Sequence, residues 1–168
     1  IVYIMGCFIL LFFAVFFSYP LQADTANIKF NHFTVEQGLS ENSIYGITRD
    51  KYGFLWFGTM DGLNRFDGYS FKIYRHDTDN PNSLGHNVIS DLMTDRSGMI
   101  WISTNSSGLD RYDPTMDRFT HFRSDPGNPR TIGSNLVYTV YEDSTGTLWI
   151  GTNGGGLNRF DAGSQTFK

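Results

Sequence analysis

The amino-acid sequence predicts an all-β fold built from repeated units, and three observations carry this prediction. Aromatic residues are abundant, with 15 Phe, 9 Tyr and 3 Trp in 168 residues, and such side chains favour strands. The chain also has 18 Gly and few helix-favouring runs after residue 24, as is typical of short strands joined by tight turns. Finally, one pattern occurs three times, around Trp56, Trp101 and Trp149.

The first residues are expected to direct export and not to join the fold. Residues 1–19 are almost wholly apolar, and a small residue, Ala23, stands where a signal peptidase would cleave. An uncleaved membrane anchor is the alternative, since about 20 apolar residues can span a bilayer. With either a signal peptide or an anchor over residues 1–23, residues 24–168 would be periplasmic or otherwise extracytoplasmic.

Each copy of the repeat carries the same motifs in the same order. An Asn stands eight residues before an Asp-x-x-Gly motif, the tryptophan follows, and Gly-Leu-x-Arg-aromatic-Asp comes last. The Asp and Gly pairs of the first motif are Asp50 and Gly53, Asp95 and Gly98, and Asp143 and Gly146. The tryptophans lie 45 and 48 residues apart. A period of this length with four strand signals predicts one four-stranded blade of a β-propeller per copy.

We therefore expect a partial β-propeller of about three four-stranded antiparallel blades after an N-terminal hydrophobic segment. The first strands are expected at 43–49, 88–94 and 136–142, and the second strands at 54–59, 99–104 and 147–152. The third strands are expected at 63–66, 109–112 and 157–160, and the fourth at 70–75, 118–123 and 166–168. The blades then cover about 40–76, 85–123 and 133–168, and the domain 24–168 is truncated at its C-terminus.

The repeated residues are expected to build the blades. Asp favours the first position of a type I turn and Gly the position with positive φ, so Asp-x-x-Gly predicts the turn between the first two strands. A calcium loop would need more oxygen ligands close together. The tryptophans are expected to pack blade against blade, with an exposed sugar-stacking role as the alternative.

Residues 28–168 resemble the two-component regulator propeller family. The resemblance rests on "GLSENS", on D-x-x-G-x-x-W-x-G-T and on "GLNRFD", with Ser103 where the other copies have Gly58 and Gly151. It implies the N-terminal sensor region of a hybrid two-component sensor histidine kinase. In that family the propellers lie in the periplasm, precede the membrane helix and kinase, and often sense glycan fragments. It therefore implies a sensor piece that is not itself an enzyme.

Three copies cannot close a ring, because propellers have at least about four blades. We therefore expect the front end of a longer protein, whose partners include the rest of the propeller and downstream sensor domains. The segment Ile28–Val35 resembles a fourth strand without its blade, and we expect it to pack elsewhere or to hang loose.

Ligand contacts are expected on the face that carries two kinds of connection. These are the connections from second to third strand and from each fourth strand to the next blade, and they vary between copies. Variable loops on a rigid scaffold are where binding groups usually sit. The candidates are Asp61, Asn105, Ser106, Asn153, Arg75, His76, Arg123 and His86. Their amides, hydroxyls and carboxylates suit sugar hydroxyls, and arginine suits an acidic sugar or a sulfate.

Other functions stay open at this point. The same loops are consistent with plain solvated turns, with an exported propeller enzyme acting on polysaccharide, or with a non-catalytic interaction scaffold that forms homodimers. No nucleophile–base pattern supports catalysis. The formal net charge of −4 and the lack of a basic block argue against nucleic acid. The single cysteine, Cys7, excludes a cysteine-based metal cluster, and no metal or cofactor is expected.

Overall fold

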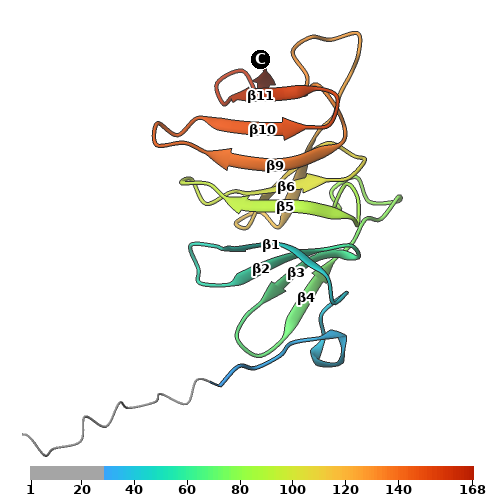
Figure 1. Ribbon diagram of the computed structural model, residues 1–168, viewed down its shortest axis with the longest axis vertical. Coiled ribbons are helices and arrows are strands. Elements are labelled where there is room, and N and C mark those ends of the chain that lie inside the picture. The colour runs from blue at the N-terminus through green and yellow to red at the C-terminus, as the bar shows by residue number, and fades with distance from the viewer. Residues whose placement is uncertain (1–28) are drawn as a thin grey trace, which may run out of the picture. The chain divides into compact units, whose positions relative to one another are not determined.

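The computed structural model describes residues 29–168, and Phe33–Lys168 form one compact unit (Figure 1). The predicted signal peptide or anchor of residues 1–23 lies outside the described residues. The described chain contains twelve strands in three four-stranded antiparallel sheets, and each sheet takes its strands in sequence order. The predicted all-β fold of three four-stranded units is confirmed.

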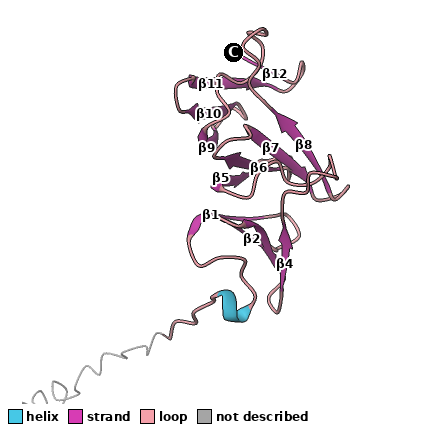
Figure 2. Cartoon of the chain, turned by 90° about the vertical axis from the view of Figure 1, so that its right-hand side faces the viewer, coloured by secondary structure: helices cyan, strands magenta, loops and turns pink. Residues whose placement is uncertain are grey.

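The strands fall close to their predicted places in every copy. The first sheet contains β1 (Ile44–Arg49), β2 (Leu55–Thr59), β3 (Gly62–Phe66) and β4 (Phe71–Tyr74). The second contains β5 (Ile89–Thr94), β6 (Ile100–Thr104), β7 (Leu109–Asp113) and β8 (Arg118–Phe122). The third contains β9 (Val137–Glu142), β10 (Leu148–Thr152), β11 (Gly156–Asp161) and the short β12 (Thr166–Phe167). Figure 2 shows the strand-and-turn character of the unit, with one short helical turn before the first sheet.

The sheets follow one another along the unit, and their first strands are neighbours: β1 lies beside β5, and β5 beside β9. Each of these strands carries a register shift at the same place against the second strand. A bulge adds one unpaired residue and bends the strand locally. The repeat therefore extends to the irregularities of the backbone.

Two apolar clusters lie between the sheets and hold them together. Between the first and second sheets, the buried Trp56 packs its ring 5.1 Å from that of Tyr112. Between the second and third, the buried Trp101 packs 5.0 Å from Phe160. Every residue of β6 is buried, because the second sheet is covered on both faces.

The Asp-x-x-Gly motifs form the turns between first and second strands. Each Gly has positive φ, 95° at Gly53 for example, and its amide donates to the Asp carbonyl. The aspartate side chain has a second task that the motif alone does not reveal. Its Oδ2 accepts from the tryptophan ring NH of the same copy, at 2.8, 2.7 and 2.8 Å for Trp56, Trp101 and Trp149.

The segment that resembles an isolated fourth strand packs elsewhere, as one of the two expectations had it: the ring of Phe33 lies 5.2 Å from that of Phe66. Lys29–Thr34 form no strand, and Val35–Gln37 form a 3₁₀ turn, η1, closed by reciprocal hydrogen bonds between Thr34 and Gln37. The physical reason lies in the sheets. A fourth strand needs a third strand to pair with, and β3, β7 and β11 already pair with the fourth strands of their own copies.

Candidate functional site

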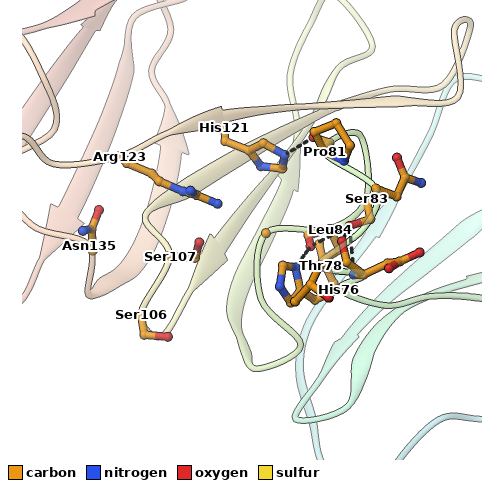
Figure 3. Close-up of a pocket in the computed structure, with 13 residues that line it drawn as sticks. His76, Thr78, Pro81, Ser83, Leu84, Ser106, Ser107, His121, Arg123 and Asn135 are labelled. Atoms are coloured by element: carbon orange, nitrogen blue, oxygen red, sulfur yellow. Dashed lines mark hydrogen bonds between the residues drawn. The ribbon is translucent and has the colours of Figure 1, made fainter.

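A cavity of about 540 Å³ opens where the connection between the first and second sheets meets the second sheet (Figure 3). Its wall includes the connection 76–85 on one side and Ser106 and Ser107, from the loop between β6 and β7, on another. His121 of β8 and Arg123, just after β8, complete the side that belongs to the second sheet.

Side-chain hydrogen bonds hold the connection 76–87 in place without regular secondary structure. Asn87 Oδ1 accepts from the backbone NH of His76 at 2.7 Å, which closes the connection at its two ends. Ser83 Oγ accepts from the NH of Asp77 at 2.9 Å. The next connection, 124–135, repeats both bonds with its own Asn and Thr. The Asn that recurs before each Asp-x-x-Gly motif therefore joins the two ends of the connection through a side-chain hydrogen bond.

A buried acid and a histidine join that connection to the second sheet. The carboxylate of Asp110, fully buried, accepts from the backbone NH of Gly85 at 2.6 Å and bonds His121 Nδ1 at 2.7 Å. His121 Nε2 lies 3.1 Å from the carbonyl of Pro81. A carboxylate and a carbonyl only accept, so both contacts are hydrogen bonds when the two ring nitrogens are protonated and the imidazole is a cation. The hydrogen bond to Asp110 raises the pKa of His121, and burial and Arg123 partly oppose that rise.

This pair is specific to the second copy. Asn64 and Asn158 stand at the position of Asp110 and accept from Ser40 and Gly133 amides at 2.9 and 2.8 Å. The strand partner of Asn64 is Ile73, whereas that of Asp110 is His121. The first copy thus has an amide beside an apolar residue at these two paired positions, and the second copy has an acid beside a base.

The arginine after each complete fourth strand also differs between copies. In the first copy, Arg75 forms an ion pair with Asp61, with Nη2 2.8 Å from Oδ2. The hydrogen bond from Arg75 lowers the pKa of Asp61. In the second copy, Arg123 is exposed and makes no side-chain hydrogen bond or ion pair with any residue that the structure describes. Figure 3 shows its guanidinium directed towards His121.

The structure brings three of the candidate residues together and leaves five apart. His76, Ser106 and Arg123 line the cavity. The other five are outside this lining: Asp61, Arg75, Asn105, Asn153 and His86. Among these five, Asp61 and Arg75 pair with each other, and Asn153 Nδ2 donates to the hydroxyl of Tyr138 at 2.9 Å.

Asp110 and His121 were missing from the candidates, although the sequence carries a signal for them. The signal is an acid, Asp110, at the Asn position of "LNRF", with a histidine in the next strand of the same copy.

Two kinds of feature are absent from residues 29–168. No group of three or more His, Cys, Asp or Glu side chains there is arranged to hold a metal ion. None of the helices in this part of the chain is long and apolar enough to cross a membrane.

Comparisons with known proteins agree with this architecture. The model of the family described as "two component regulator propeller" matches residues 38–61, 83–106 and 131–154. Each match covers the last residues of the connection before a sheet and that sheet's first two strands. Histidine kinase P4 of Formosa agariphila is 44% identical over 80 residues, which are 48% of this chain and 6% of that protein.

Two solved structures of B. thetaiotaomicron proteins are also similar. Both are extracellular domains of proteins described as hybrid two-component systems. One is 32% identical with a TM-score of 0.78, and the other is 30% identical with a TM-score of 0.65. In each case the match covers 82% of this chain and 19% of the solved chain. The chain thus spans about a fifth of those domains. It carries three repeats of the two-component regulator propeller family, one for each of its sheets.

Proposed function

We propose that this chain is the N-terminal part of the extracytoplasmic sensor region of a hybrid two-component system, where it helps to bind a glycan-derived ligand. The repeat family, the similarity to histidine kinase P4 and the similarity to two extracellular domains support this assignment. Kinase activity would belong to the longer protein. The sheets themselves would bind, and would pass a conformational bias towards the membrane.

The cavity beside the second sheet is the observation that carries the binding role. It lies on the face of the connections, and most of its lining residues are polar. Some of them differ between copies, such as His76, Ser106 and His121. Ser106, Ser107 and Thr78 offer hydroxyl groups, and His76 has one ring nitrogen, Nε2, beyond the Nδ1 that bonds the Leu84 carbonyl. Such groups suit the hydroxyls of a sugar.

The test is a binding screen on the extracytoplasmic region with this chain in its natural context. Isothermal titration against a broad panel of oligosaccharides is expected to give at least one saturable ligand. The double variant His76→Ala/Ser106→Ala should weaken that ligand, and Asn153→Ala, outside the cavity, serves as the matched control. If no oligosaccharide of the panel binds, or if the double variant binds the ligand as tightly as the wild type does, the support for this site is removed.

A further inference from the structure

The two arginines that follow β4 and β8 occupy equivalent places in their copies. Arg75 and Arg123 each come directly after the fourth strand, and each faces the loop between second and third strands. Within that loop, Asp61 and Ser107 are also equivalent. Each directly precedes a glycine at or just before the start of the third strand. The backbone NH of Asp61 donates to Thr59 Oγ1 at 3.0 Å, and that of Ser107 donates to Thr104 Oγ1 at 3.1 Å.

The first copy shows what an arginine at this place binds. Arg75 approaches the Asp61 carboxylate with two nitrogens, Nε at 3.2 Å from Oδ1 and Nη2 at 2.8 Å from Oδ2. This fork geometry is the one that guanidinium groups use for carboxylates and for other planar or tetrahedral oxyanions. The loop itself supplies the anion in this copy.

In the second copy the anion is missing and a cavity stands in its place. Ser107 replaces the acid, and neither its hydroxyl nor that of Ser106 makes a hydrogen bond with the described residues. The cavity of about 540 Å³ that they line together with Arg123 is large enough for a sugar unit.

The charges around the cavity favour an anion beside Arg123. His121 is a second cation when it is protonated, and its partner Asp110 is fully buried and has contacts with the Gly85 amide and with His121 Nδ1. Asp77, the acidic residue of the lining, uses its carboxylate to accept from the amide of Asp79 at 3.0 Å. Neither carboxylate forms an ion pair with Arg123.

We propose that this cavity binds an anionic group of the ligand, a sugar carboxylate or a sulfate. The group takes beside Arg123 the place that the Asp61 carboxylate takes beside Arg75. Arg123 is the binding residue, the hydroxyls of Ser106 and Ser107 are further donors, and His121 adds positive charge. Asp110 is a positioning residue that acts through His121. This inference rests on the proposed function, because it names the chemical class of the ligand.

The experiment compares charged and neutral ligands on matched variants. Isothermal titration of the extracytoplasmic region would use glucuronate-bearing, sulfated and neutral oligosaccharides of equal length at fixed ionic strength. Arg123→Gln is expected to weaken the charged ligands about 10-fold or more, as loss of a charge-assisted hydrogen bond predicts. Ser107→Asp, which restores the internal acid of the first copy, should weaken them similarly. Arg75→Gln, outside the cavity, should leave binding unchanged.

The two charged ligands distinguish between the possible anionic groups, since tighter binding of the glucuronate-bearing or of the sulfated oligosaccharide identifies the group. The inference would be overturned if neutral ligands bound as tightly as charged ones and if Arg123→Gln had no more effect on binding than Arg75→Gln. The proposed sensor function would remain in that case. A wild-type region that binds no saccharide at all would instead overturn the proposed function.

A second measurement keeps the inference testable if a variant does not fold. Sodium sulfate, titrated into the wild-type region against sodium chloride at equal ionic strength, should shift the Arg123 Nε–Hε NMR signal in a saturable way. The Arg75 signal is the internal reference, because its guanidinium is already paired. Signals of both arginines that stay unmoved by sulfate would contradict the inference.

Discussion

At the scale of single residues, the aspartate of each Asp-x-x-Gly turn links the turn to the packing between sheets. Asp50 Oδ1 accepts from the amides of Tyr52 and Phe54 at 2.9 and 3.0 Å, while Oδ2 accepts from the ring NH of Trp56 at 2.8 Å. Trp56 is fully buried between the first and second sheets. One carboxylate therefore fixes both the turn and the orientation of the principal packing residue.

We expect Asp50→Ala to lower the free energy of unfolding by about 2–4 kcal/mol, because it leaves a buried indole NH without an acceptor. Trp56→Phe removes the donor and keeps an aromatic ring, so the double variant should cost less than the sum of the two single variants. Urea denaturation of the four proteins measures this coupling. Strict additivity would show that the Asp–Trp bond does not contribute.

The His121–Asp110 pair predicts a pH-dependent stability. The pKa of His121 is raised in the folded protein by its bond to Asp110. The stabilisation is therefore fully present below the unfolded pKa of about 6.5, and it is lost as pH rises through the higher folded value. The groups that face this ring are Asp110 from β7, the Pro81 carbonyl from the connection 76–87, and Arg123 after β8.

The measurement is the free energy of unfolding from pH 5.5 to 9 for the wild type and His121→Gln. The difference between them should be largest at pH 5.5–6.5 and should shrink towards pH 9. Asp110→Asn restores the residue of the other two copies, and it should remove most of this pH dependence. A difference that stays constant over the whole range would contradict the assignment of a protonated His121.

The sequence could predict this site in part. The connections that form it were identified by their variation between copies, and His76, Ser106 and Arg123 were among the candidates for that reason. The pairing of Arg75 with Asp61 depends on how two loops of one copy face each other, which spacing along the chain does not determine. Asp110 was not among the candidates, because it belongs to a repeated motif and a repeated motif predicts a structural role.

At the scale of strands, most element positions followed from the repeat alone. The motifs place turn residues at fixed offsets, so β2, β6 and β10 were predicted within one residue of their observed starts. The segment Lys29–Thr34 forms no strand, which agrees with the expectation that it packs elsewhere or hangs loose. Its sequence resembles a fourth strand, but a strand forms only where an unpaired neighbour exists, and this depends on the partner and not on the segment.

Gly58 and Ser103 occupy equivalent positions in β2 and β6, and they predict opposite effects. A Cβ on Gly58 would meet Leu92 and Ile89 of the second sheet at distances that no real contact shows. Ser103 is fully buried, and its hydroxyl finds no hydrogen-bond partner in the described structure. The contact between the first two sheets therefore requires glycine, whereas the second sheet accepts a side chain at the same place.

We expect Gly58→Ala to destabilise the protein by about 1–3 kcal/mol through overpacking between the sheets. Ser103→Ala removes a buried hydroxyl without a partner and should stabilise by up to about 1 kcal/mol. Thermal unfolding followed by circular dichroism measures both effects, and the two variants are controls for each other. Effects of the same sign would mean that the sheets do not pack as described.

At the scale of the whole unit, stability is distributed unevenly among the three sheets. The second sheet is covered on both faces, and all five residues of β6 are buried. The first and third sheets each have one apolar face in solvent, where Ile47 is 63% exposed and Leu157 is 67% exposed. Sheets that contact only their neighbours contribute their own stability and that of each shared interface.

This arrangement predicts graded hydrogen exchange in the chain. Backbone amides of β6 and β7 should exchange most slowly, because their opening requires that both interfaces separate. Trp56→Ala should speed exchange mainly in the first sheet, and Trp101→Ala mainly in the third, since each ring fills one interface. Exchange measured by mass spectrometry on peptides of each sheet can separate these patterns. If either substitution accelerated all three sheets equally, the unit would unfold as one cooperative block, and the additive description of its sheets would have to be abandoned.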